Sequence, residues 1–386
     1  MHQFHIAPKA VLAAFPFPGE IVDASRYGEG HINDTFAVTC RVDNSAESTP
    51  RRFILQRINR FVFKNPIQVM ENILGVTRHI EDTFLRSGGG VSGAVNGAEA
   101  GDRTETGNSH RECLRVLPTL SGEFWHIDEA GDTWRLYNFI EQAVSFQRVE
   151  TPELFAASAR AFGQFAGLLQ DYPVHLLHDT IPHFHDTPLR FSAFLEAVES
   201  AEPSLRESCR EEIRFVLERK EDCQYLEREK AAGRLPLRVT HNDTKLNNVM
   251  IDPDRLEPVC VIDLDTVMPG LWAYDFGDAI RFGASTAAED ERDLSLVSLD
   301  LDLYHTYRRA FLETAGTAIT AAEIESLPWG ARLMTLECGM RFLTDYLQGD
   351  LYFKIHRPQH NLDRCRAQFR LLQDMEKKWE QMVSFT

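Results

Sequence analysis

The pattern of apolar and polar positions changes near residue 140, and the two sides of this point predict different structures. Before it, short runs rich in apolar and β-branched residues predict strands, which lie at 36–42, 52–58, 113–117 and 133–140. Apolar residues at helical spacing predict a helix over 66–86, and a shorter helix is expected over 8–17. Residues 1–140 are therefore expected to form a lobe built on a sheet.

After residue 140 the pattern becomes helical. Thr151 and Pro152 offer an N-cap followed by proline at the first helical position, and the apolar stripe that follows is typical of a core helix. Another long amphipathic helix is predicted over 321–347. Residues 141–386 are therefore expected to form a larger, helical lobe. Segment 87–112 is rich in glycine, serine, alanine and charge, so we expect a mobile, peripheral insertion there.

Length, net charge and cysteine content argue against several kinds of partner and site. The chain has 386 residues, enough for two lobes with a sizeable core. Its formal net charge of −17 argues against a nucleic-acid partner. The 7 cysteines are scattered and form no CxxC pair, which argues against a zinc site or a disulfide framework. Neither a signal peptide nor a membrane span is visible, so we expect a cytoplasmic protein without a membrane partner.

The most informative stretch is 237–278. Two apolar runs, 249–251 and 258–262, flank an Asp-Pro-Asp turn and predict a hairpin. Asp243 and Asn248 come just before the first run and Asp263 follows the second, so two carboxylates and an amide are expected at one end of the hairpin. Oxygen ligands of this kind suit Mg²⁺ shared with substrate phosphates.

The order His-x-Asp-x₄-Asn over residues 241–248 also has the spacing of a kinase catalytic loop. In such loops the Asp receives the proton of the attacking hydroxyl and the Asn holds a metal ion. Taken singly, Asp243 could be a turn former, Asn248 a cap and Asp263 a strand end. Their conjunction favours a phosphotransfer site.

Three other features each allow two interpretations. Gly28 and Gly30 precede a predicted strand, where glycine backbone can approach a phosphate or can simply form a turn. Asp275 either accepts backbone N–H groups of the catalytic loop or caps the next helix. Arg341 lies four residues from both Glu337 and Asp345, so these residues form an exposed ion-pair ladder or Arg341 faces a substrate cleft.

Several blocks of sequence resemble those of the N-acetylhexosamine 1-kinases, within the broad family of aminoglycoside phosphotransferases and choline kinases. The blocks are YGEGHIND from Tyr27, HNDTKLNN from His241, CVIDLDTVMPG from Cys260, DFGDAIRFGAST from Asp275 and ECGMRFLTDYLQGDLYF from Glu337. The resemblance extends from about Tyr27 to the last helix. Its catalytic-loop and IDLD motifs are specific to the broad family, whereas the block from Glu337 is similar to the sugar 1-kinase group.

The resemblance implies an α+β, protein-kinase-like fold, with a small antiparallel-sheet N-lobe over ATP and a larger, mainly helical C-lobe that binds a sugar. It implies transfer of phosphate from ATP to the anomeric hydroxyl of N-acetylglucosamine or N-acetylgalactosamine, with Asp243 as base and with Mg²⁺ held by Asn248 and Asp263. By matching position, residues that cover the phosphates or flank adenine would be Gly28, Gly30, His31, Tyr137 and Phe139. Those at the sugar, beside Asp243, would be Asp265, Thr266, Arg341 and Tyr352. A monomer is expected.

One departure from the broad family bears on mechanism. The second hairpin strand usually carries a lysine that pairs with the phosphates and with a helix glutamate, and here Gln56 stands at that place. Arg57 follows it and should face the other side of the strand. The missing lysine favours one alternative, a catalytically silent nucleotide- or sugar-binding protein. The other alternative is another alcohol kinase of this fold, acting on an aminoglycoside, choline, homoserine or a different sugar.

Overall fold

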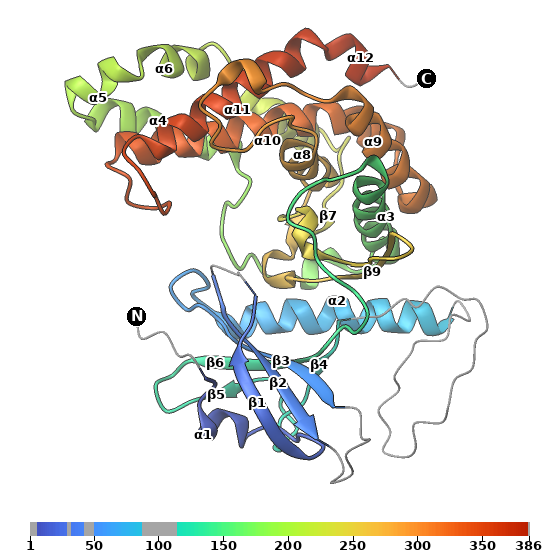
Figure 1. Cartoon of the computed structure of the whole chain (residues 1–386). Coiled ribbons are helices and arrows are strands. Elements are labelled where there is room, and N and C mark those ends of the chain that lie inside the picture. Colours follow the sequence, from blue (N-terminus) through green and yellow to red (C-terminus); the bar gives the residue numbers. More distant parts are fainter. Residues whose placement is uncertain (1–5, 29–31, 42–49, 87–113, 385–386) are drawn as a thin grey trace.

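A computed structural model of the chain describes residues 6–28, 32–41, 50–86 and 114–384. A sheet with one long helix forms one lobe, and a bundle of helices forms the other, as Figure 1 shows. This arrangement confirms the predicted α+β organisation. The insertion expected over 87–112 lies outside the described residues.

The sheet lobe contains six antiparallel strands in the order β1-β2-β3-β6-β4, with β5 paired to β6. The strands are β1 (Glu20–Arg26), β2 (Asp34–Arg41), β3 (Arg51–Arg57), β4 (Val116–Leu117), β5 (His126–Ile127) and β6 (Thr133–Asn138). The helices are α1 (Lys9–Leu12) and α2 (Pro66–Arg86). The predicted strands and the helix over 66–86 are confirmed, with shifts at the strand ends. The pattern did not predict β1, because only Ala24 of this edge strand is buried and the other six residues are exposed or partly buried.

The two faces of the sheet pack against different partners. Leu55 and Trp134 point to the face that packs against α1. Ile54 and Tyr137 point to the face that packs against α2 and against C-lobe residues such as Leu264. Because side chains alternate along a strand, Gln56 and Arg135 share this second face, and the register pairs them across β3 and β6.

Two of the long helices in the helical lobe follow the sequence signals. The helix α3 (Pro152–Leu168) begins where predicted, and the Thr151 side chain accepts the N–H of Leu154. The predicted helix over 321–347 is α10 (Ala321–Leu347). The remaining helices are α4 (Thr187–Ser200), α5 (Pro203–Ser208), α6 (Arg210–Leu217), α7 (Tyr225–Ala231), α8 (Trp272–Gly283), α9 (Leu301–Ala315), α11 (His360–Lys377) and α12 (Trp379–Val383).

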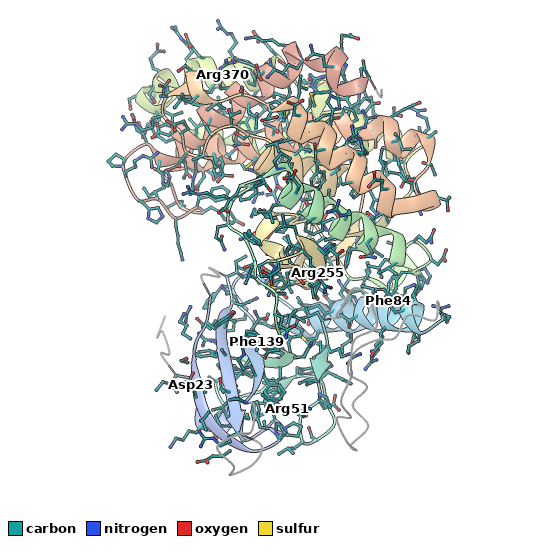
Figure 2. All side chains as sticks on the ribbon, turned by 45° about the vertical axis from the view of Figure 1, so that its right-hand side comes forward. Asp23, Arg51, Phe84, Phe139, Arg255 and Arg370 are labelled. Atoms are coloured by element: carbon teal, nitrogen blue, oxygen red, sulfur yellow. The ribbon has the colours of Figure 1, made fainter. Side chains whose placement is uncertain are left out.

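Two small strand pairs connect this bundle to the sheet lobe. The strand β7 (Arg238–Thr240) pairs with β10 (Met268–Gly270), and the predicted hairpin is formed by β8 (Val249–Asp252) and β9 (Glu257–Val261). Figure 2 places Arg255, in the hairpin turn, at the level where the lobes meet, and Phe139 in the sheet lobe. In the described part of the chain, none of the helices combines the length and apolar character needed to span a bilayer.

Candidate active site

The β8–β9 hairpin brings the predicted metal-binding residues to one end. Val249 pairs with Val261 at the last step of the ladder. Beyond that step, the Ile262 N–H donates to the Asn248 carbonyl at 2.9 Å. Asn248 and Asp263 are therefore neighbours across the hairpin end, although 15 residues separate them in the sequence.

The carboxylate of Asp243 is held by two other side chains of the same loop. Asn248 Nδ2 donates to Asp243 Oδ2 at 3.0 Å and to the Asp243 carbonyl at 2.8 Å. Lys245 Nζ lies 2.7 Å from Asp243 Oδ1 in an ion pair. The predicted association of Asp243 with Asn248 is thus present in the structure.

Lys245 was not predicted to take part, although its position two residues after Asp243 was a usable signal. Burial disfavours the ammonium, but the charges of Asp243 and Asp278 outweigh it and raise the pKa of Lys245. Asp278, on α8, in turn accepts hydrogen bonds from Arg281 Nε at 3.1 Å and Nη2 at 2.8 Å. Lys245 therefore carries a positive charge beside the carboxylate of Asp243.

The backbone of the catalytic loop is fixed by Asp275. Its two carboxylate oxygens accept the N–H groups of His241 at 2.8 Å and Asn242 at 2.7 Å, and its carbonyl accepts the Thr244 hydroxyl. Burial raises the pKa of Asp275 to about 6. The N-cap of α8 is Leu271. The loop-supporting interpretation of Asp275 is therefore confirmed, and the capping interpretation is wrong.

The loop after β9 places Asp263 in an unusual backbone conformation. Asp263 has φ +60°, in the left-handed region, and precedes the 3₁₀ turn Leu264–Thr266. The residue as a whole is exposed, but its carboxyl lies in a partly desolvated region among charged groups. Desolvation by the surrounding protein and the like charges of Asp265 and Asp243 raise its pKa to about 7, against the opposing effect of Arg135.

The residues at the hairpin end fit a divalent cation. The amide nitrogen of Asn248 is engaged by Asp243, and its Oδ1 accepts no hydrogen bond from the described residues. Desolvation and, after it, the charges of nearby carboxylates raise the pKa of Asp263, and a cation would relieve the repulsion between these carboxylates. Among the described residues, His, Cys, Asp and Glu side chains do not gather in threes as an all-protein metal cage. Two protein ligands suit a hard cation that shares its other positions with phosphates and water.

Asp265 is not free in this structure. Its side chain is 3% exposed, and Arg135 Nη2 lies 2.6 Å from Oδ1. Oδ2 accepts a hydrogen bond from Asn33 Nδ2 at 2.6 Å. Arg135 was not predicted as a site residue, because a single arginine in a strand carries no local signal. Asp265 thus ties the C-lobe to β6 and to the residue preceding β2.

Thr266 and Tyr137, which the resemblance places at the sugar and at adenine, have structural partners here. The Thr266 hydroxyl donates to the His241 carbonyl at 2.7 Å, and the Thr266 carbonyl accepts Asn242 Nδ2 at 2.8 Å. Tyr137 is 3% exposed and packs in the core beside α2, with Arg135 5.0 Å from its ring centre. Both side chains therefore help to hold the site together.

Phe139 lies beside the start of the glycine motif. Its ring centre is 5.7 Å from that of Tyr27, and the Arg52 guanidinium lies 3.8 Å above it. Gly28 has φ +75°, a conformation that glycine adopts without strain. Gly30 and His31 lie outside the described residues. Tyr27 and Arg52 are aromatic and cationic neighbours of Phe139 that the motifs did not identify.

Arg341 and Tyr352 flank the ring of Phe353. The Arg341 guanidinium lies 5.5 Å from that ring centre, and the ring centre of Tyr352, a 73% exposed residue, lies 4.8 Å from it. The Arg341 charge also acts on Arg190, whose pKa is lowered by burial and by this like charge. Arg190 lies on α4, Arg341 on α10 and Tyr352 on the segment that follows α10. We call these three residues the arginine–tyrosine surface.

The alternative of an exposed ladder along α10 is wrong. Glu337 is fully buried, where its Oε1 lies 3.0 Å from His185 Nδ1 and its Oε2 accepts the Thr187 hydroxyl. Asp345 is also buried and accepts the backbone N–H groups of residues 351–353. The two carboxylates position His185 and the segment that carries Tyr352. Within the described residues, Arg341 has its contact with the Phe353 ring and forms no ion pair with Glu337 or Asp345.

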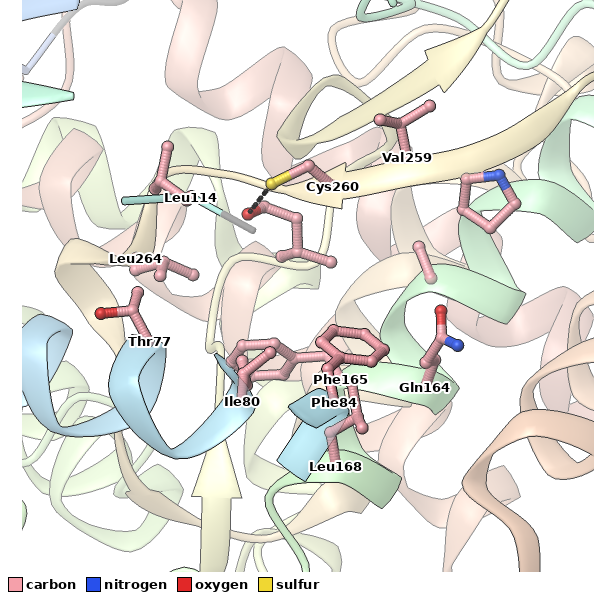
Figure 3. A pocket seen from close by; sticks show the side chains of 13 residues that line it. Thr77, Ile80, Phe84, Leu114, Gln164, Phe165, Leu168, Val259, Cys260 and Leu264 are labelled. Carbon is pink, nitrogen blue, oxygen red and sulfur yellow. Dashed lines mark hydrogen bonds between the residues drawn. The ribbon is translucent and has the colours of Figure 1, made fainter. Parts of the chain in front are cut away.

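A separate apolar cavity of about 60 Å³ lies where α2, α3 and β9 meet (Figure 3). Phe84, Phe165 and Leu264 line it, and the Cys260 thiol donates to the neighbouring Val261 carbonyl at 3.3 Å. The lining includes neither Asp243 nor Asp263. An apolar cavity of this size does not suit a nucleotide phosphate, so the charged cluster above is the candidate active site.

Comparison with known proteins agrees with this site. The model of the "Phosphotransferase enzyme family" matches residues 98–310, more than half of the chain, and this range contains the catalytic loop, the hairpin and Asp275. The chain belongs to this phosphotransferase family. Members of the family transfer phosphate to alcohol acceptors.

Solved structures show that this phosphotransferase has a kinase-like fold. An aminoglycoside phosphotransferase from Alicyclobacillus acidocaldarius is 15% identical, with 99% of this chain and 98% of that chain covered and a TM-score of 0.60. An amicoumacin kinase in complex with AMP-PNP, Ca²⁺ and amicoumacin is 13% identical, with 94% and 91% covered and a TM-score of 0.56. A choline kinase from Cryptosporidium parvum is 12% identical, with 94% and 91% covered and a TM-score of 0.51.

Proposed function

We propose that this phosphotransferase is an N-acetylhexosamine 1-kinase, which transfers the γ-phosphoryl group of ATP to the anomeric hydroxyl of N-acetylglucosamine or N-acetylgalactosamine. The observation that carries the proposal is the cluster at the hairpin end. There Asp243 is held by Asn248 and Lys245, and Asp263 lies close enough for its pKa to respond to the Asp243 charge. The proposal concerns a monomer in the cytoplasm, with ATP and a small sugar as its partners.

Asp243 is the proposed general base. Asn248 Nδ2 orients Oδ2 at 3.0 Å, and Oδ1, which pairs with Lys245, keeps a lone pair that can face an acceptor hydroxyl while the loop backbone stays fixed by Asp275. An anomeric hydroxyl is more acidic than an ordinary alcohol, so a carboxylate is a sufficient base. Most of the rate enhancement in phosphoryl transfer comes from positioning and from neutralising charge.

Two other groups supply the neutralising charge. Lys245 stands 2.7 Å from Asp243, where its ammonium can contact the phosphoryl group in transfer. Mg²⁺ would be held by Asn248 Oδ1 and the Asp263 carboxylate, and it would neutralise the triphosphate when bound. The related amicoumacin kinase holds a nucleotide analogue together with Ca²⁺, which supports a nucleotide and a divalent cation at this kind of site.

The positive charge of the arginine–tyrosine surface, where we place the acceptor, favours a neutral, hydroxyl-rich acceptor. Arg341 and Arg190 lie close enough for the charge of Arg341 to lower the pKa of Arg190. Glu337, a carboxylate whose charge acts on Arg190, is buried against His185 and Thr187. Two guanidinium groups would repel the cationic acceptors choline and aminoglycosides, whereas their donors suit sugar hydroxyls and an acetamido carbonyl.

The proposal is tested with a panel of acceptors and an ADP readout. N-acetylglucosamine and N-acetylgalactosamine are expected to give ADP release that depends on Mg²⁺, and phosphorus NMR should place the product phosphate on the anomeric oxygen. Glucose, choline, homoserine, ethanolamine and kanamycin serve as the comparison acceptors. Faster turnover with choline or kanamycin would instead assign an alcohol kinase of different specificity. ATP binding without ADP release from any acceptor would indicate a silent binding protein.

A further inference from the structure

The sheet lacks a lysine on β3, but the neighbouring strand carries a cation at the same place. The register sets Gln56 of β3 opposite Arg135 of β6. Gln56 Oε1 accepts hydrogen bonds from Arg135 Nε at 3.0 Å and from Arg135 Nη2 at 2.8 Å. Gln56 Nε2 donates to the Thr35 hydroxyl at 3.0 Å, which fixes the orientation of the amide. The guanidinium of Arg135 is thus held where a β3 lysine would project.

The counter-ion also differs from the usual lysine–glutamate pair of kinases. The acidic residues of α2 have other surroundings: Glu71 pairs with His178 at 2.8 Å, Glu81 pairs with Arg115 at 3.0 Å, and Asp82 is exposed. Arg135 pairs instead with Asp265, which lies across the lobe boundary. Arg135 therefore stands in place of the usual lysine, and Asp265 stands in place of the usual glutamate.

Two buried atoms of this pair lack a hydrogen-bond partner in the described part of the chain. Arg135 is 1% exposed, and its Nη1 donates to no described group. Asp265 Oδ1 is 2.6 Å from Arg135 Nη2, but the contact does not have hydrogen-bond geometry. A buried donor without an acceptor is costly, so Nη1 indicates a ligand acceptor that completes the site.

We propose that Arg135 contacts the phosphate groups of the bound nucleotide, in place of the β3 lysine, and that Gln56 and Asp265 position it. This inference rests on the proposed function. The planar guanidinium has one nitrogen, Nη1, left over beside its hydrogen bonds to Gln56 and its ion pair with Asp265, and its geometry matches phosphate oxygens. Asp263 and Asp265 stand in the same turn after β9, and Asn248 links Asp243 to that hairpin end, so the site gathers carboxylates and needs cations before a triphosphate can enter.

The deciding comparison is between ligands with and without phosphates. Calorimetry of Arg135→Gln should show ADP binding, with Mg²⁺ present, weakened about 10- to 100-fold, the effect of losing a charge-assisted hydrogen bond. Adenosine binding should stay within about twofold, because adenosine carries no phosphate. An Arg135 that only joins the lobes would leave ADP affinity unchanged or weaken ADP and adenosine alike. Either result would overturn the inference.

Two further variants sharpen the test. Gln56→Lys added to Arg135→Gln returns a cation to β3 and should restore at least part of the lost ADP affinity. Arg57→Gln is the matched control, since Arg57 lies on the other face of β3 and forms ion pairs with Asp34 and Asp132. It should leave the ratio of ADP to adenosine affinity unchanged. A double variant that binds ADP no better than Arg135→Gln would contradict a role defined by charge.

The test separates this inference from the proposed function. Nucleotide binding is measured without an acceptor, so the identity of the sugar does not enter. A wild-type protein that binds no ADP would overturn the proposed function and this inference with it, whereas a wild type and Arg135→Gln with equal ADP affinity would overturn this inference alone. If thermal melting shows that Arg135→Gln is unfolded, Arg135→Lys takes its place. The lysine variant should weaken ADP more than adenosine, because it loses the fork of donors.

Discussion

The proposed phosphate and acceptor sides of the candidate site differ in how firmly other residues hold their side chains. On the phosphate side, Asp243, Lys245 and Asn248 contact one another and rest on a loop fixed by Asp275. On the proposed acceptor side, Arg341 is partly exposed and Tyr352 is 73% exposed, and both lie beside the ring of Phe353. The phosphate side is preorganised, whereas the acceptor side is open.

This difference agrees with the division of labour in a kinase. Charge neutralisation and alignment of the phosphoryl group need fixed groups, because catalysis depends on donors placed before the reaction begins. Acceptor recognition can instead use exposed side chains that order around the ligand. We therefore expect changes on the phosphate side to lower turnover with every acceptor, and changes on the acceptor side to alter the choice of acceptor.

The largest effect is expected from Asp243→Asn. Loss of a general base lowers turnover by about 10²- to 10⁴-fold, and the loss should be equal for all acceptors. ADP affinity should stay nearly unchanged, because the amide keeps the size of the carboxylate. Asp254→Asn, in the exposed hairpin turn, is the matched control for loss of one carboxylate. Near-normal turnover of Asp243→Asn in a coupled ADP assay would remove Asp243 from the role of base.

The second largest effect is expected from Asp275, which supports the catalytic loop on the phosphate side. Asp275→Ala leaves the buried N–H groups of His241 and Asn242 without acceptors, so the free energy of unfolding should fall by about 2–5 kcal/mol. Urea denaturation followed by circular dichroism measures this change. Asp302→Ala, at an exposed position of α9, should change stability by less than about 0.5 kcal/mol. Equal stabilities of the two variants would show that Asp275 does not support the loop.

A substitution on the acceptor side should change the KM for the sugar rather than the turnover with every acceptor. Arg341→Ala is expected to raise the KM for the sugar about 10-fold, the effect of one lost hydrogen bond to a charged group, with the KM for ATP unchanged. Arg332→Ala provides the control, because Arg332 lies on the same helix but pairs with Asp222 and Glu376. If Arg341→Ala lowered kcat equally for all acceptors, the division between the two sides would fail.

The smallest effect is a pH dependence of metal binding. The pKa of Asp263 is raised to about 7 by desolvation and by the charges of Asp265 and Asp243, so the carboxyl is largely protonated below that pH. A proton competes with a cation for the same oxygen atoms. Mn²⁺ affinity should therefore rise up to about tenfold per pH unit below pH 7 and level off above it. Calorimetric titration at several pH values measures this slope, and a flat profile would contradict it.

The phosphate side could be predicted from the sequence because its residues are close in the chain. Asp243 and Asn248 share one loop, and a hairpin with a short turn brings Asp263 back to them. Asp275 was identified with two open interpretations, and only the hydrogen bonds to residues 241 and 242 decided between them.

The features that the sequence did not predict depend on contacts between distant residues. Arg135 and Gln56 are 79 residues apart in the sequence and meet only because β6 pairs with β3. Asp265, which pairs with Arg135, belongs to the other lobe. Glu337 was expected to be exposed if it formed a ladder, but His185 and Thr187 cover it. Such pairings follow from strand register and helix packing, which local periodicity does not specify.

The most direct test of the central claim is electron paramagnetic resonance of Mn²⁺ with AMP-PNP in the wild type and in two variants. If Asp243, Asn248 and Asp263 meet around a metal-bound triphosphate, Asp263→Asn should lose the bound Mn²⁺ signal, while Asp243→Asn should keep that signal and lose turnover. An Asp263→Asn protein that binds Mn²⁺ and AMP-PNP as tightly as the wild type would contradict the account.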